Sequence, residues 1–224
     1  MEFLRQALVI AGKDLTLELR SRERMVSMLT FSVLVAVVFS FAVDPTVPSG
    51  NFAAPMLWVT ILFSGILGLG RSFALEREQE ALSGILLAPV DRGAVFLGKF
   101  LANLAMLLAT EAVILPVFAL FFQLSPGRGL LGVALVAVLA SVGFMALGTL
   151  FSAIALNTRL GEMMIPILLL PLLIPVVIFA AASTHRLLAG RPFAEVAGSL
   201  RMLLAFDLIF LVVCTLVFGS VMEE

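Results

Sequence analysis

Charged side chains are scarce in this sequence. Of its 224 residues only 13% are charged, against about 25% in an ordinary soluble domain, and 62% are hydrophobic, against roughly 45–50%. A single soluble core cannot hide that much apolar surface. The composition therefore excludes an ordinary soluble protein and predicts a protein of the lipid bilayer.

Residues with catalytic or metal-binding chemistry are also few. The sequence has one cysteine, Cys214, and one histidine, His185. Cys214 has no second cysteine for an intrachain disulfide or a Cys-based metal site. Neither the H-E-x-x-H nor the G-x-S-x-G motif occurs, so a membrane hydrolase is poorly supported. We expect no catalytic residue, no metal site and no directly bound cofactor. We expect His185 to be a polar residue of an outer loop, with contact to a metal or a haem iron as the alternative.

The net charge is −1, and charges of both signs are confined to short stretches. No basic patch of the kind that binds nucleic acid is present, so we expect no nucleic-acid partner. The N-terminus carries acidic residues before its first long apolar run, unlike the short basic start of a signal peptide. We therefore expect the N-terminal residues to belong to the mature protein.

Apolar windows long enough to cross a bilayer occur six times. A spanning helix needs about 20 predominantly apolar residues to cover about 30 Å of hydrocarbon. The sequence predicts an all-α integral membrane protein whose six-helix transmembrane domain covers residues 25–222. Its expected transmembrane helices are residues 25–43, 52–71, 99–123, 129–156, 163–184 and 202–222.

Basic residues fall mainly on one side of this arrangement. With the N-terminus inside, ten lysines and arginines lie in inner segments and four in outer segments, and basic residues are retained in the cytoplasm. Both termini are therefore expected to be cytoplasmic.

Two cytoplasmic elements are expected outside the spans. Residues 1–24 carry apolar side chains at helical spacing, from Phe3 to Leu19, with Arg5, Lys13, Asp14 and Glu18 largely on another side. This pattern predicts an amphipathic elbow helix lying in the membrane surface. The second element is residues 72–98, a coupling segment with acidic residues from Glu76 onward and a helix-ending proline at Pro89.

The coupling segment is expected to hold a short cytoplasmic helix of its own. Its apolar residues Leu82, Ile85 and Leu86 have no membrane to bury them, so they indicate a docking surface for another protein. The string Gly93 to Lys99 matches G-x-x-x-x-G-K, but Phe100 stands where a phosphate-binding loop needs Ser or Thr, and no strand precedes it. We expect loop glycines at a helix entry, with Lys99 reaching the membrane interface.

Charges and prolines inside the spans are further candidates. Glu111 and Asp207 are costly in hydrocarbon, so each is either a transport residue or a carboxyl group that is neutral or reaches water. Pro166, Pro171 and Pro175 bend the fifth span, either as a hinge or for shape alone. Small residues in spans two and four predict close packing within the bundle.

Three stretches resemble the CcmB family, the membrane subunit of the cytochrome c maturation system. They are EREQEALSGILLAPVDR at residues 76–92 followed by LGK at 97–99, LLLPLLIPVVIFA at 168–180, and NTR at 157–159. The resemblance covers most of the chain and implies a permease subunit of the ABC-2 transporter type in the bacterial cytoplasmic (inner) membrane.

The resemblance also implies partners. It implies a CcmA-like ATPase that hydrolyses ATP for this subunit, CcmC-like and CcmD-like membrane proteins, and haem as the cargo. It leaves open whether haem crosses this subunit or ATP hydrolysis releases a haem-loaded chaperone. The tryptophan-rich motif of CcmC is missing here, where Trp58 is the only tryptophan. Six spans resemble half of a pathway, so a second copy or another membrane subunit is expected.

The coupling segment and the resemblance point to the same contact. We expect residues 76–92 to dock on the ATPase. The residues expected to make this contact are Glu76, Glu78, Glu80, Leu82, Gly84, Ile85, Leu86, Pro89, Asp91 and Arg92. The alternatives are a permease of the same type for a drug, lipid or polysaccharide, and a non-transporting membrane scaffold or membrane enzyme.

Overall fold

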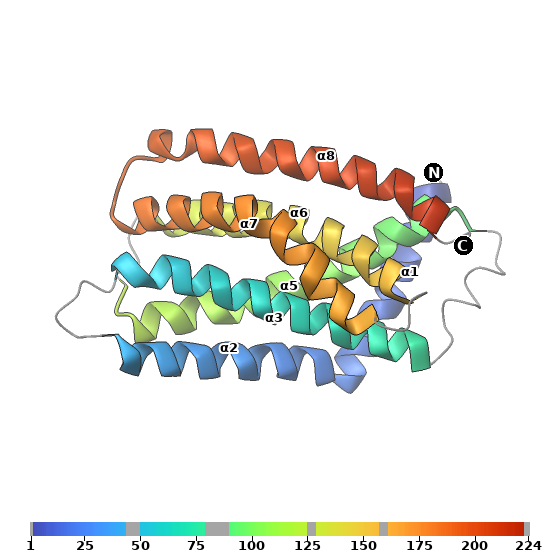
Figure 1. The fold of residues 1–224 in the computed structure, drawn as a ribbon, viewed down its shortest axis with the longest axis horizontal. Coiled ribbons are helices and arrows are strands. Elements are labelled where there is room, and N and C mark those ends of the chain that lie inside the picture. The colour runs from blue at the N-terminus through green and yellow to red at the C-terminus, as the bar shows by residue number, and fades with distance from the viewer. Residues whose placement is uncertain (1, 44–49, 79–89, 125–128, 157–160, 222–224) are drawn as a thin grey trace.

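The computed structural model describes residues 2–43, 50–78, 90–124, 129–156 and 161–221, and within these ranges it contains no strand. The helices in chain order are α1 (Glu2–Ser21), α2 (Glu23–Ala42), α3 (Gly50–Glu78), α5 (Arg92–Phe121), α6 (Leu130–Leu156), α7 (Gly161–Leu188), the 3₁₀-helix η1 (Phe193–Glu195) and α8 (Ala197–Val221) (Figure 1).

Six of these helices, α2, α3 and α5 to α8, are long and apolar enough to cross a membrane. They range from 20 residues in α2 to 30 residues in α5. At about 1.5 Å per residue these lengths are about 30 to 45 Å, which matches or exceeds the hydrocarbon thickness of about 30 Å. The prediction of an all-α protein with six spans is confirmed.

The six long helices form one bundle around α6. α6 contacts α3, α5, α7 and α8, and its buried side chains include Phe144 and Met145. α2 and α8 run along opposite outer sides of the bundle (Figure 1). The small residues predicted to pack do so at Gly148, where an added Cβ would lie 2.4 Å from Cδ1 of Leu69 on α3. Gly143 instead lies against Asp207 of α8.

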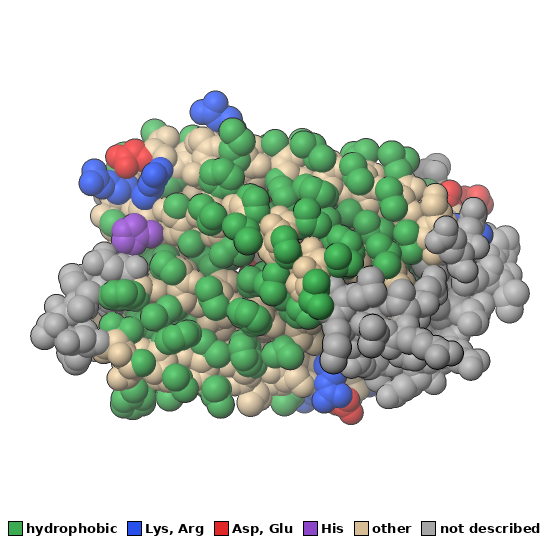
Figure 2. All heavy atoms as spheres, in the orientation of Figure 1, with side chains coloured by type: hydrophobic (Ala, Val, Ile, Leu, Met, Phe, Trp, Pro, Cys, Tyr) green, Lys and Arg blue, Asp and Glu red, His purple; other side chains and the backbone are tan. Residues whose placement is uncertain are grey.

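Hydrophobic side chains cover the long face of the bundle, and charged side chains gather toward its two ends (Figure 2). α8 illustrates the pattern, because Leu208 is 61% exposed and Leu216 is 73% exposed. Exposing an apolar surface of this kind to water is unfavourable, whereas contact with the acyl chains of a bilayer is not. The apolar sides of the bundle are therefore its lipid-facing surface.

α1 crosses one end of the bundle at a steep angle to the other helices (Figure 1). It packs mainly on α5, and it connects to α2 through Arg22, whose φ of 56° lies in the left-handed region. This conformation costs conformational energy in a residue that has a Cβ atom. Here it turns the chain sharply between α1 and α2. The start of α1 and the end of α8 lie at this same end of the bundle (Figure 1).

The prediction gave α1 one apolar side and one polar side. The structure adds a third side, which is buried against the bundle. Ala7, Ala11 and Glu18 are buried against the bundle, while Leu4 and Leu8 are exposed. The predicted elbow helix is present, but Glu18 does not lie on its water-facing side. Glu18 instead faces a small cavity that it shares with Arg24 of α2 and with Lys99 and Asn103 of α5.

Two helices begin at least five residues before their predicted spans. α5 begins at Arg92 rather than at residue 99, and α8 begins at Ala197 rather than at residue 202. The prediction treated Lys99 and Arg201 as the ends of membrane segments. A helix can continue beyond the hydrocarbon, however, and Arg201 is exposed outside the bundle core.

The start of α5 is set by a cap. The side chain of Asp91 accepts hydrogen bonds from the backbone N–H groups of Gly93 and Ala94, at 2.8 and 3.3 Å. Gly93 and Gly98 therefore lie inside α5, and the prediction that they were loop glycines is wrong.

Candidate functional site

The predicted coupling segment is continuous with two of the long helices. Glu76 and Glu78 belong to the last turn of α3, so no separate helix begins at Glu76. Asp91 caps α5, and Arg92 is its first residue. The other expected ATPase-contacting residues, Glu80, Leu82, Gly84, Ile85, Leu86 and Pro89, lie outside the described residues.

The start of α5 is bound to both ends of the chain. The amide side chain of Gln6 on α1 accepts a hydrogen bond from the backbone N–H of Asp91 at 3.4 Å. Arg92 Nη1 donates to the carbonyl oxygen of Gly219 near the end of α8 at 3.3 Å. A displacement of the segment that precedes α5 would therefore act on α1 and α8 together.

α1 and α5 approach closely at Gly98. A Cβ atom built on Gly98 would lie 2.7 Å from the carbonyl oxygen of Ala7 and 2.8 Å from Cβ of Ile10. The first of these atoms is backbone and cannot rotate away. Only glycine permits α1 to lie this close to α5.

Further along α1 and α5 from this contact lies a group of charged and polar side chains, which we call the α1 cluster. It consists of Asp14, Glu18, Arg24, Lys99 and Asn103, which surround a cavity of about 30 Å³. Arg24 is only 3% exposed, and its Nη1 donates to Oδ1 of Asn103 at 2.8 Å.

The α1 cluster joins four helices. Lys99 Nζ lies 3.7 Å from Oδ2 of Asp14, which links α5 to α1. Asn103 Nδ2 donates to Oγ1 of Thr149 at 3.0 Å, which links α5 to α6. Two carboxylates face two cations, so the formal charge of the cluster balances. Removing one member would leave an uncompensated buried charge, which is why these helices are expected to move as one unit.

Glu111 and Asp207 lie on different neighbours of α6. Glu111 on α5 is 2% exposed and accepts a hydrogen bond from the Ser141 hydroxyl at 2.6 Å. Asp207 on α8 is 4% exposed, and an added Cβ on Gly143 would lie 2.6 Å from its Oδ1. The two carboxyl groups thus contact α6 near the same depth, and their predicted transport role stays a prediction.

His185 lies in the last turn of α7 rather than in an outer loop, so that prediction is wrong. Among the described residues no three His, Cys, Asp or Glu side chains are grouped so that they could hold a metal ion. α7 remains a continuous helix through Pro166, Pro171 and Pro175, and it bends along its length (Figure 1). A bend fits both the hinge and the shape interpretation.

These features define a multi-pass helical membrane protein with an N-terminal helix clamped across one end of its bundle. The comparisons with known proteins are more specific. The CcmB protein family model matches residues 5–223, and the chain belongs to this family.

Three relatives support this assignment, each carrying the name Heme exporter protein B. The protein from Rhodobacter capsulatus is 29% identical over 84% of this chain and 88% of its own length. The protein from Paracoccus denitrificans is 32% identical over 80% of this chain and 82% of its own length. The protein from Pseudomonas aeruginosa is 25% identical over 82% of each chain.

Proposed function

We propose that this chain is the membrane permease subunit of a haem export system that serves c-type cytochrome biogenesis. The observation that carries the proposal is the family match over residues 5–223, together with relatives named for haem export that cover most of the chain. The chain itself is not an enzyme in this proposal, and a separate ATPase subunit supplies the work.

The proposed location is the bacterial inner membrane with both chain ends in the cytoplasm. The distribution of basic residues supports this orientation, because α1 and the start of α5 carry Arg5, Lys13, Arg20 and Arg92 at one end of the bundle. The opposite end carries Arg186, Arg191 and Arg201.

The proposed contact with the ATPase is the segment between α3 and α5. α3 leads into this segment and α5 follows it. The first turn of α5 is hydrogen-bonded to α8, and Asp91 just before it is hydrogen-bonded to α1. A partner that pushes the segment would shift these helices as a body. CcmC-like and CcmD-like proteins and a second copy of this chain are the proposed neighbours in the membrane.

The test is complementation of a bacterium that lacks its own haem-export permease subunit. Expression of this chain with its cognate ATPase is expected to restore c-type cytochromes, measured by haem staining of membrane proteins. Restoration of another export activity without c-type cytochromes would identify a permease for a different cargo and defeat the proposal.

The docking contact has its own test. The double variant Leu82→Asp/Leu86→Asp is expected to lose co-purification with the ATPase while still inserting in the membrane. The control is Leu120→Asp/Leu131→Asp, which places the same two charges on residues that are 76% and 85% exposed at the opposite end. Equal co-purification of both variants would refute the docking contact.

A further inference from the structure

The turn between α1 and α2 carries exposed arginines at the boundary of the membrane. α2 has 20 residues, and at about 1.5 Å per residue it is just long enough to cross hydrocarbon of about 30 Å. Its first residue, Glu23, therefore lies at the level of the lipid headgroups. Arg20 and Arg22 come directly before α2 and are exposed at this level. Figure 2 shows basic side chains at the edge of the bundle where α2 begins.

The acidic side chains in the second half of α1 do not balance these arginines. Glu18 is 7% exposed and faces the cavity of the α1 cluster, and Asp14 lies 3.7 Å from Lys99 in the same cluster. Within the described ranges, neither Arg20 nor Arg22 forms a salt bridge. The turn therefore presents an uncompensated positive charge to the headgroup region.

A third exposed arginine lies at the same end of the neighbouring helix. An added Cβ on Gly68 of α3 would lie 3.3 Å from Nε of Arg24, which places this part of α3 beside the start of α2. Arg71 follows one turn later along α3 and is exposed. The three arginines outnumber Glu23, the exposed carboxylate of the turn.

Apolar side chains lie next to these arginines. Leu8 and Leu19 are 11 residues apart, or about three helical turns, so they share one side of α1. Both are mostly exposed, and so is Val26 in the first turn of α2. An apolar side beside a basic side, at headgroup depth, is the pattern of a surface that contacts both acyl chains and headgroups.

We propose that the turn between α1 and α2 binds an anionic phospholipid, with its phosphate at Arg20 and Arg22 and its acyl chains along Leu19 and Val26. A guanidinium pairs well with phosphate oxygens. Arg22 Nε donates to the carbonyl oxygen of Leu19 at 3.4 Å, and a guanidinium has further N–H donors for a phosphate. This inference goes beyond the proposed function and does not depend on it.

The excess positive charge decides which phospholipid is favoured. A zwitterionic lipid such as phosphatidylcholine carries a cation that offsets its phosphate, whereas phosphatidylglycerol keeps a net negative charge. Each basic residue close to an anionic lipid surface strengthens binding roughly fivefold, so two arginines give a preference of about 25-fold.

The experiment titrates the purified full chain in neutral detergent with phosphatidylglycerol or phosphatidylcholine that carry the same acyl chains. Native mass spectrometry measures the dissociation constant of the first bound lipid. We expect phosphatidylglycerol to bind the parent chain about 25-fold more tightly than phosphatidylcholine does.

Two double variants locate the site. Arg20→Gln/Arg22→Gln is expected to weaken phosphatidylglycerol binding about 25-fold and to leave phosphatidylcholine binding unchanged. The matched control, Arg186→Gln/Arg201→Gln, removes the same charge from exposed residues at the opposite end of the bundle and should bind as the parent does. Arg20→Lys/Arg22→Lys keeps the charge and should still prefer phosphatidylglycerol.

Three outcomes would overturn the proposal. The first is equal affinity of the parent chain for the two lipids, and the second is equal loss of phosphatidylglycerol binding in the two glutamine double variants. The third is a lysine variant without preference for phosphatidylglycerol. Failure of the complementation experiment would count against the proposed function and leave this result unchanged.

Discussion

Two lysines approach the carboxylate of Asp14 from different surroundings. Lys13 Nζ is 3.1 Å from Oδ1, but its side chain is 45% exposed. Lys99 Nζ is farther away, at 3.7 Å from Oδ2, but its side chain is only 8% exposed. Water screens the first pair and leaves it worth about 0.2 to 1 kcal/mol, whereas burial makes the second pair costly to break.

The longer ion pair is therefore predicted to matter more. Lys99→Met should lower the free energy of unfolding by up to about 3 kcal/mol, a value below the range for fully buried pairs because Asp14 is 20% exposed. Lys13→Met should change it by less than about 1 kcal/mol. Thermal unfolding in detergent compares the two variants. A larger effect of Lys13→Met would show that distance outweighs burial at this carboxylate.

At the scale of elements, the seating of α1 on α5 depends on Gly98. The side chains around it could adjust to a methyl group, but the carbonyl of Ala7 could not. The sequence pattern predicted a loop at this glycine and gave no sign of its close contact with α1. The signal that could have located it inside a helix is Asp91, whose side chain caps α5.

The expected effect of Gly98→Leu is displacement of α1. Overpacking of this kind costs about 1 to 3 kcal/mol, and here it is relieved when α1 lifts from the bundle. Trypsin should then cleave faster after Arg22, at the junction of α1 and α2. Gly12→Leu is the control, because a Cβ on Gly12 meets no atom within 4 Å. Equal cleavage of both variants would argue that the close contact does not hold α1.

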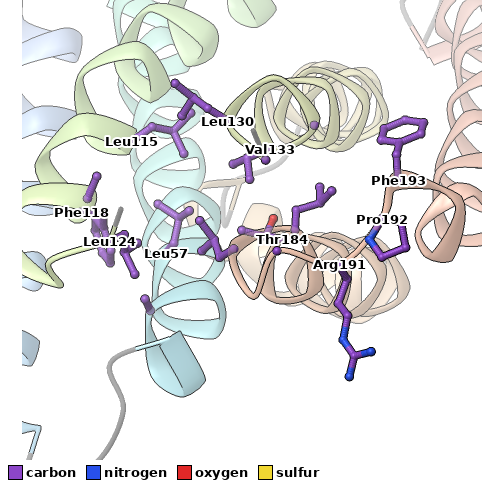
Figure 3. Close-up of a pocket in the computed structure, with 17 residues that line it drawn as sticks. Leu57, Leu115, Phe118, Leu124, Leu130, Val133, Thr184, Arg191, Pro192 and Phe193 are labelled. Atoms are coloured by element: carbon purple, nitrogen blue, oxygen red, sulfur yellow. The ribbon is translucent and has the colours of Figure 1, made fainter. Parts of the chain in front are cut away.

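At the scale of the whole molecule, the two ends of the bundle are chemically different. One end carries α1 and its charge-balanced cluster, and the other carries a mostly apolar cavity with Arg191 among its lining residues (Figure 3). The proposed orientation places the first end in the cytoplasm and the second end outside.

Thiol labelling in whole cells can check this orientation. Cys214 is buried in α8 and should react little, so single cysteines can be added without removing it. A membrane-impermeant maleimide is expected to label Glu195→Cys in intact cells and to label Lys13→Cys only after permeabilisation. Both parent side chains are exposed, at 44% and 45%. The reverse pattern would invert the proposed topology.

The features that could be predicted from the sequence, the spanning helices, depend on local composition. Each apolar window of about 20 residues identifies its own spanning helix, so six spans could be found without knowledge of their neighbours. The α1 cluster could not be found in this way, because Arg24 and Asn103 are 79 residues apart in sequence. The cavity lined by Leu57, Leu115 and Leu130 is likewise built from residues of four helices, and its leucines resemble those of any lipid-facing surface.

The α1 cluster also constrains how the protein is assembled. The ribosome makes α1 before α5, and Lys99 and Asn103 emerge only after α2 and α3 have been synthesised. Until then, Asp14 and Glu18 have no cation from α5 near them. The newly made helix is therefore expected to lie at the membrane–water interface. α1 thus leaves the ribosome before α5 but can be fixed in its final place only after α5 has been made.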